Sequence, residues 1–273
     1  MKQSEIKHYT ESNRAAWNEV MPMHQQAAKD KWDRLFSQPG YVQLDEIEIE
    51  LLRQRGIKGM DVVHLCCNNG VELMSLKNLG AGECVGFDIS DEAIKEAGER
   101  AAQCNIDCQF VRTDVYEIDD SYNNRFEMLY ITVGCLGWMP DLGLFFEKAA
   151  RLLREDGLVF IHEIHPFLDM LPVDERGATD ILRIVGSYFK TEPFAEPGGL
   201  DYVGNTEYES KTTEYWFVHT LSDIMMNLIG NGISIEHFTE YPTAISPNHR
   251  KFEETQAGMP LSFILIGRKG KGG

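Results

Sequence analysis

The stretch "VVHLCCNNGVELMSLKNLG", residues 62–80, decides the fold of this chain. It begins with a short apolar run, and leucines then recur at helical spacing up to Gly80, which predicts a strand, a tight turn and a helix. A nucleotide-binding turn of this kind normally carries several glycines. Here the turn itself holds only Gly70, preceded by two cysteines and two asparagines. Asparagine is among the best non-glycine residues for a positive φ, so Asn68 favours a working loop in altered residues.

The pattern continues outward as alternating strands and helices, which predicts an α/β fold with a mostly parallel, doubly wound sheet and helices on both faces. Strands are expected at 61–66, 84–88, 108–112, 126–131, 158–164, 233–241 and 261–267. Helices are expected at 11–36, 43–53, 69–79, from Ser90 onward, 141–153 and 221–229. We expect Pro22 to interrupt the first helix, and Leu44, Ile47 and Leu51 to form the inner face of the second.

The chain has 26 basic and 43 acidic residues, a net charge of −17. This balance disfavours nucleic acid and anionic membranes and suits a small neutral or cationic partner. The first ten residues are polar, and the apolar runs are too short to span a bilayer, so we expect neither a secretory signal nor a membrane segment. Six scattered cysteines suggest a reducing compartment, and we therefore expect a cytoplasmic protein. A monomer and a homodimer both remain open.

Two carboxylates follow predicted strands, where ligands of parallel sheets bind. Asp88 ends the second strand about 20 residues beyond the first turn, which suits hydrogen bonds from a ribose. Asp114 follows the third strand and could accept from an adenine amine, although an Asx turn would also explain it. Neither G-x-G-x-x-G at the first turn nor a P-loop occurs, which argues against a dinucleotide and a nucleoside triphosphate.

Five stretches in this order resemble the class I S-adenosylmethionine-dependent methyltransferases: "VVHLCCNNG", "CVGFDIS", "FVRTDVYEI", "FEMLYITVGCLGWMPDL" and "LLREDGLVFIHEIHP". The likeness covers roughly residues 40–165 and 221–268. It is greatest to a bacterial small-molecule branch whose first motif reads H-L-x-C, with an early N-R-x-x-W element and H-P after the fifth strand. These elements correspond here to Asn13, Arg14 and Trp17, and to His165–Pro166.

The resemblance implies a Rossmann-like core that binds S-adenosylmethionine and releases S-adenosylhomocysteine after methyl transfer to a small molecule. The expected parts are an N-terminal helical cap at 1–40, a cofactor-binding core at 41–165, a substrate-covering insertion at 166–220 and the rest of the core sheet at 221–273. A non-catalytic protein that binds these two ligands is the alternative. Residues expected to contact the cofactor are Trp17, Cys66, Asn68, Gly70, Asp88, Ile89, Asp114, Val115 and Thr132. The small Cys66 could still present its backbone to the methionine part of the cofactor if its φ is ordinary.

The segments expected to enclose the methyl acceptor have a less regular sequence pattern than the core. A general base is needed only if the acceptor must lose a proton, and His165, furthest beyond the fifth strand, is the first candidate, with His162, Glu163 and His219 as others. A strand points His162 and His165 to opposite faces, so this pair predicts no metal site. Aromatic side chains could hold a flat or cationic acceptor, and we expect this role of Trp138, Tyr188 and Trp216.

Overall fold

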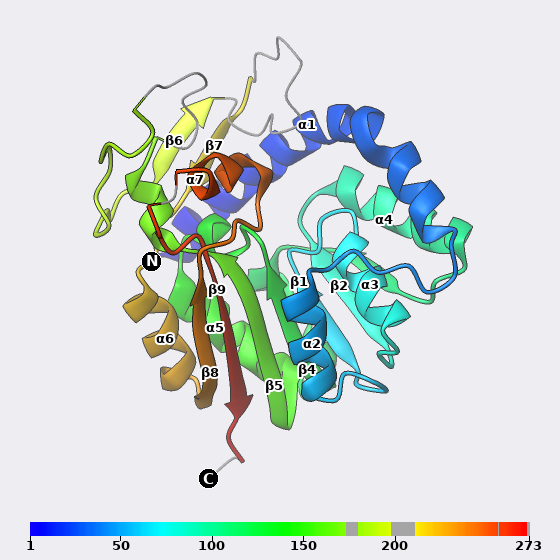
Figure 1. The fold of residues 1–273 in the computed structure, drawn as a ribbon. Coiled ribbons are helices and arrows are strands. Elements are labelled where there is room, and N and C mark those ends of the chain that lie inside the picture. Colours follow the sequence, from blue (N-terminus) through cyan, green and yellow to red (C-terminus); the bar gives the residue numbers. More distant parts are fainter. Residues whose placement is uncertain (173–179, 198–210, 256, 272–273) are drawn as a thin grey trace.

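The computed structural model describes residues 1–172, 180–197, 211–255 and 257–271. Its centre is one seven-stranded sheet in the order β3-β2-β1-β4-β5-β9-β8 (Figure 1). The five strands β1 to β5 are parallel, whereas β9 runs antiparallel between β5 and β8. Their bounds are β1 Val62–Leu65, β2 Cys84–Asp88, β3 Gln109–Arg112, β4 Phe126–Thr132, β5 Leu153–Ile164, β8 Ile233–Tyr241 and β9 Ser262–Lys269. The predicted doubly wound, mostly parallel sheet is confirmed.

Helices cover both faces of this sheet because each presents an apolar stripe to it. On one face, Leu52 of α2 and Leu73 and Leu76 of α3 pack against Tyr130 and Phe160 of the sheet. On the other face, α5 and α6 pack through side chains such as Phe145, Phe146, Ile224 and Leu228. The bounds of these helices are α2 Glu46–Gln54, α3 Val71–Asn78, α4 Asp91–Cys104, α5 Leu142–Leu152 and α6 Leu221–Gly230. Ser90 caps α4, as its sequence predicts.

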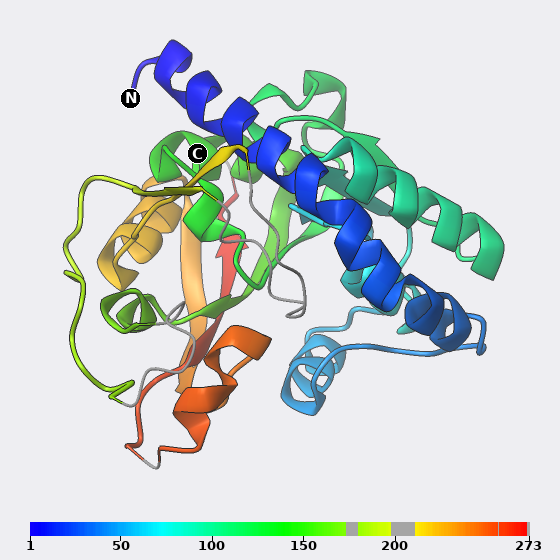
Figure 2. The ribbon, with the colours of Figure 1, turned by 90° about the horizontal axis from the view of Figure 1, so that it is seen from above.

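Helix α1 runs unbroken from Gln3 to Phe36 and crosses the molecule beside the ends of the sheet strands (Figure 2). The expected interruption at Pro22 is wrong. Pro22 is exposed, so solvent can satisfy the carbonyl that loses its intrahelical partner, and the curvature of α1 in Figure 1 accommodates the ring. Within the described residues, no helix combines the length and apolarity needed to cross a membrane.

Two further expectations need correction. Leu44 and Leu51 pack against the core as expected, but the buried side chains of α2 are Glu48 and Leu52, and Ile47 is 42% exposed because the helix turns a polar side chain toward the sheet. Strand β5 begins at Leu153 rather than Leu158. It does so because Leu153 pairs with Phe126 of β4, and Arg154 reaches Asp61 at 3.1 Å.

The segment after β5 forms a short helical turn at Pro166–Met170 and a two-stranded antiparallel sheet of β6 Phe194–Pro197 and β7 Thr213–Trp216. This small sheet lies against α1 (Figure 1). Two parts of the predicted insertion, 173–179 and 198–210, lie outside the described residues. Another short helix, α7 Arg250–Glu253, follows β8.

Candidate functional site

A cavity of about 1270 Å³ opens at the carboxyl ends of the parallel strands. Most of the side chains expected to bind ligands lie in its wall. They are Trp17, Cys66, Asn68, Asp88, Ile89, Asp114, Val115, Thr132, Trp138 and Trp216. Its volume exceeds the usual range of about 300–1,000 Å³ for small-molecule pockets. Its wall runs from the β1–α3 loop to the segment that precedes α7.

The β1–α3 loop has three alternating residues in the left-handed region: Cys66 at φ 56°, Asn68 at φ 46° and Gly70 at φ 77°. The positive φ that asparagine favours is confirmed at Asn68, whereas Cys66 does not have the ordinary φ on which its backbone contact with the cofactor was conditioned. Glycine reaches this region most easily, so the loop retains a glycine-type backbone with only one glycine. Gly70 has a second constraint, because a Cβ there would lie 2.5 Å from Cζ of Phe110. Gly70 shapes the turn but does not line the cavity.

Asp88 organises this loop through both carboxylate oxygens. One oxygen accepts from the backbone N–H of Asn68 at 2.8 Å and the other from that of Ser90 at 2.8 Å. Burial raises the pKa of Asp88, and the backbone hydrogen bonds from Ser90 and Asn68 oppose this effect. Each oxygen retains a lone pair that can accept from a ligand hydroxyl.

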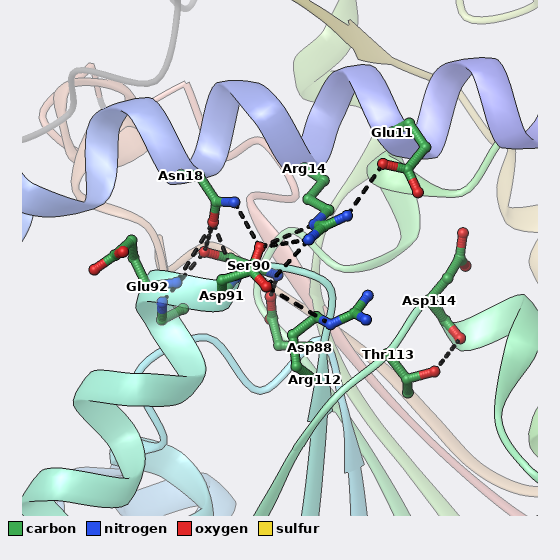
Figure 3. A network of polar contacts seen from close by, with 11 residues as sticks. Glu11, Arg14, Asn18, Asp88, Ser90, Asp91, Glu92, Arg112, Thr113 and Asp114 are labelled. Carbon is green, nitrogen blue, oxygen red and sulfur yellow. Dashed lines mark hydrogen bonds and ion pairs between the residues drawn. The ribbon is translucent and has the colours of Figure 1, made fainter.

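Helix α1 clamps the start of α4, as Figure 3 shows. The Asn18 carbonyl oxygen accepts from the Ser90 hydroxyl at 2.8 Å and from the Asp91 N–H at 2.9 Å. Arg14 donates to both carboxylate oxygens of Asp91, at 2.9 and 3.1 Å. One turn away, Asn13 exchanges two hydrogen bonds with the backbone of Tyr215 in β7. The N-R-x-x-W element therefore joins α1 to two neighbours, while Trp17 faces the cavity.

Arg100 holds the β1–α3 loop from its buried side. Sequence reasoning did not identify this residue. Its fully buried guanidinium donates to the Asn69 carbonyl at 2.9 Å and to Asp33 at 2.9 Å, and it also pairs with Glu96. The i, i+4 spacing of Glu96 and Arg100 on a helix was the available signal, but such pairs are usually on the surface.

The third strand end supplies Asp114. Its carboxylate accepts from the Tyr116 N–H at 3.0 Å, the Asx turn considered above. Burial raises the pKa of Asp114, against hydrogen bonds from Thr10 and Tyr116. Figure 3 shows Asp114 across from Arg14 and Asp88, on the next strand end. The Asx turn and a ligand contact are compatible, since Asp114 also lines the cavity.

Three tryptophans form a continuous wall. The rings of Trp17 and Trp138 meet edge to face with centroids 5.7 Å apart, and those of Trp138 and Trp216 with centroids 5.0 Å apart. The Trp216 indole N–H donates to Asp169 at 2.9 Å. Gly137 makes room for this arrangement, because a Cβ there would lie 2.2 Å from the Trp216 ring.

Tyr188 and His165 do not line the cavity. The Tyr188 hydroxyl accepts from the Leu221 N–H at 3.0 Å, at the start of α6. One ring nitrogen of His165 accepts from the Phe167 N–H at 3.1 Å, and the other lies 2.9 Å from Glu240. His219 bonds the Met139 carbonyl at 2.8 Å, and Glu163 accepts from the N–H groups of Gly134 and Leu136. These contacts are with protein groups, so they give these four candidates structural partners.

His162 differs from them, because it lines the cavity beside two carboxylates of α2. Its Nδ1 lies 3.3 Å from Glu48 Oε2 and 3.6 Å from Asp45 Oδ2. Burial lowers the pKa of His162, but the hydrogen bond and charge of Glu48, with the charge of Asp45, outweigh it and raise the pKa overall. Sequence reasoning missed both carboxylates, because Asp45 and Glu48 look like an ordinary helix start.

His64 lies deeper in the same wall. It is 1% exposed, and neither ring nitrogen has a hydrogen-bond partner among the described residues. Its ring meets Tyr130 edge to face at 5.0 Å. Burial lowers the pKa of His64 to about 3, so the imidazole is neutral at pH 7. Nearby, Glu72 on α3 has its pKa raised to about 7, mainly by burial.

Comparison with known proteins gives this geometry a family context. Residues 62–157, from the first residue of β1 to Gly157, match the family model described as "Methyltransferase domain". This part of the chain therefore resembles a methyltransferase domain. The matched stretch holds the β1–α3 loop, Asp88, Asp114 and Thr132, and therefore most of the expected cofactor contacts.

Two curated relatives resemble parts of the chain. One is a ubiquinone biosynthesis O-methyltransferase of Mesorhizobium japonicum, 26% identical over 129 residues, which cover 47% of this chain and 51% of that protein. Another is a ribosomal protein L11 methyltransferase of Dictyoglomus thermophilum, 33% identical over 76 residues, which cover 28% of this chain and 25% of that protein. The chain spans about half the length, or less, of these relatives.

The solved structures support the fold over a longer stretch. An S-adenosylmethionine-dependent methyltransferase from Mesorhizobium loti superposes with a TM-score of 0.57 at 20% identity. The superposition covers 81% of this chain and 96% of that chain. The described part of the chain therefore has the Rossmann-like fold of class I methyltransferases, and residues beyond 62–157 extend the matched stretch.

Proposed function

We propose that this protein transfers a methyl group from S-adenosylmethionine to a small-molecule acceptor. The observation that carries the proposal is the β1–α3 loop. In this loop Cys66, Asn68 and Gly70 adopt left-handed backbone conformations, and the Asn68 N–H donates to the carboxylate of Asp88 at the end of β2. The loop and this carboxylate both border the large cavity. The matched methyltransferase domain supports the same reading.

The residues present fit the cofactor. Asp88 can accept from the ribose hydroxyls, and Asp114, one strand further, can accept from the adenine amine. His64 offers unpartnered ring nitrogens inside the cavity, as a site for a polar ligand requires. Bound S-adenosylmethionine supplies an electrophilic methyl carbon and a good leaving group, so the protein's own work is alignment and exclusion of water.

We place the acceptor between the tryptophan wall and the α2 side of the cavity. Trp17, Trp138 and Trp216 provide flat apolar surface, while His162 and Glu48 provide polar contacts. The proposal assigns no proton transfer to His165, because protein groups contact both of its ring nitrogens. The net charge of −17 supports a small molecule over nucleic acid as the acceptor. The six free cysteines suit a reducing compartment such as the cytoplasm.

The first test is isothermal titration of the full chain with S-adenosylhomocysteine, with NAD as the control ligand. We expect micromolar binding of the first and none of the second. Acceptor pools would then be screened for formation of S-adenosylhomocysteine from S-adenosylmethionine. Failure to bind S-adenosylhomocysteine would overturn the proposal, and binding without turnover of any acceptor would favour the non-catalytic alternative.

A further inference from the structure

The α2 side of the cavity carries a set of side chains to which the proposed methyl transfer assigns polar contacts with the acceptor but no chemical step. Asp45 and Glu48 come from the start of α2, and His162 comes from the end of β5, more than 100 residues away in the chain. One ligand atom from each lies within 4.8 Å of the other two. Two carboxylate oxygens and one imidazole nitrogen are a common donor set for divalent metal ions.

The distances match a coordination sphere. Ligands that bind one ion at about 2.0–2.2 Å lie about 2.9–3.6 Å from each other in octahedral or tetrahedral geometry. The His162 Nδ1 is 3.3 Å from Glu48 Oε2 and 3.6 Å from Asp45 Oδ2. Both distances from His162 are at or close to the upper part of this range, and all three ligand atoms lie within 4.8 Å of one another.

Each carboxylate is held by its other oxygen. Asp45 Oδ1 accepts from the Glu48 N–H at 2.8 Å, because Asp45 caps the helix. Glu48 Oε1 accepts from the buried Tyr130 hydroxyl. Both carboxylates thus keep one oxygen toward His162, and the donors behind them orient these ligands as outer-shell partners do in metal sites.

Two observations indicate that a polar ligand binds in this part of the cavity. His64, beside Tyr130, is buried in the same cavity wall, and neither of its ring nitrogens has a partner among the described residues. Glu48 is 3% exposed, and a further carboxylate, Glu72, lines the same cavity. Carboxylates grouped in this way are normally compensated by cations or by metal ions.

We propose that Asp45, Glu48 and His162 bind a divalent cation at the acceptor end of the cavity. The side chain of Asp45 is 47% exposed, which leaves coordination positions facing the cavity. An acceptor oxygen, from a hydroxyl or a carboxylate, completes the sphere and is thereby positioned and polarised. The role of the acceptor rests on the proposed function, whereas metal binding does not. The H-x-x-H pair considered in the sequence holds no metal, because only His162 faces the cavity.

The test uses Mn²⁺ as the probe on the full chain, by titration calorimetry and by loss of the free Mn²⁺ spectrum in electron paramagnetic resonance. Salt at about 0.15 M screens diffuse binding to the acidic surface. Wild type should bind one ion. Glu48→Gln and His162→Gln should each weaken binding at least about 10-fold, and Tyr130→Phe by about 10-fold through loss of the outer-shell hydrogen bond.

Glu50→Gln is the matched control, because Glu50 is exposed on the same helix and does not line the cavity. It should bind Mn²⁺ as wild type does. The proposal is overturned if wild type leaves the Mn²⁺ spectrum unchanged, or if Glu48→Gln binds as tightly as Glu50→Gln. The same samples are titrated with S-adenosylhomocysteine. If Glu48→Gln binds S-adenosylhomocysteine, the variant is folded. If wild type binds Mn²⁺ but not S-adenosylhomocysteine, the proposed function is wrong and the metal site still stands.

Discussion

The two ends of the cavity are built in different ways. At the cofactor end, Cys66, Asn68 and Asp88 lie on consecutive β–α units and occupy successive strand ends. At the acceptor end, Glu48 and His162 meet although they lie 114 residues apart in the sequence. The cofactor end is formed by residues that are near one another in the sequence, whereas the acceptor end forms only when distant segments meet in the folded sheet. Substitutions at one end should therefore affect the binding of its own ligand and have little effect at the other end.

The largest expected effect tests whether the cofactor end depends on its buried support. Arg100→Met removes the guanidinium that holds the Asn69 carbonyl and leaves Asp33 and Glu96 without it. Breaking a buried ion pair in this way should lower the free energy of unfolding by about 3–5 kcal/mol. Urea denaturation measures the loss. Arg112→Met is the control, because Arg112 is 45% exposed and its pair with Asp91 should contribute less than about 1 kcal/mol. Equal losses would mean that Arg100 does not support the loop.

Asp88→Ala tests the proposed ribose contact. A charge-assisted hydrogen bond contributes about 1.5–3 kcal/mol, so the affinity for S-adenosylhomocysteine should fall roughly 10- to 150-fold by calorimetry. Glu48→Gln, at the other end, should leave this affinity within about twofold, since it makes no contact with the β1–α3 loop. If both variants weakened binding alike, the division of the cavity into two ends would be wrong.

His64 lies between the two ends, and its buried neutral ring should make the protein sensitive to acid. Its pKa is about 3 in the folded protein and 6.5 in the unfolded chain, so the unfolded state binds more protons between these values. Stability is then lost as the pH falls below 6.5, and at pH 5 the loss is about 2 kcal/mol. Denaturation at pH 7.5 and pH 5 should show this extra loss in wild type and not in His64→Leu. Identical pH dependence in both would show that His64 is accessible to protons.

The smallest effect concerns the left-handed Cys66. Cys66→Gly relieves the strain of a positive φ but adds backbone entropy to the unfolded chain, so stability should stay within about 0.5 kcal/mol. Cys66→Val places a branched side chain in the same conformation and should cost about 1–2 kcal/mol. Thermal unfolding distinguishes the two, and a stable valine variant would refute the strained backbone at this position.

Sequence reasoning succeeded where a residue's neighbours in the chain determine its role. The seven strands of the large sheet, the cap at Ser90 and the positive φ of Asn68 follow from local pattern, and the structure confirms them apart from the earlier start of β5. The inner face of α2 could not be predicted, because Glu48 is buried only through Tyr130 and His162 on distant strands. His165 was favoured for its position beyond β5, yet its partner Glu240 comes from β8. Contacts between residues that are far apart in the sequence cannot be recognised from the spacing or periodicity of residues along the chain.

Helix α1 gives the two ends a mechanical link. Asn13 is bonded to β7, next to the tryptophan wall, and Asn18 is bonded to the start of α4, next to Asp88. Five residues of helix separate them, a rise of about 7.5 Å. We expect a displacement of α1 at one of these points to reach the other, and any coupling of the two affinities that ligand binding causes in this way must be reciprocal. In that case α1 would influence the order in which the methyl donor and the acceptor bind and in which the products leave.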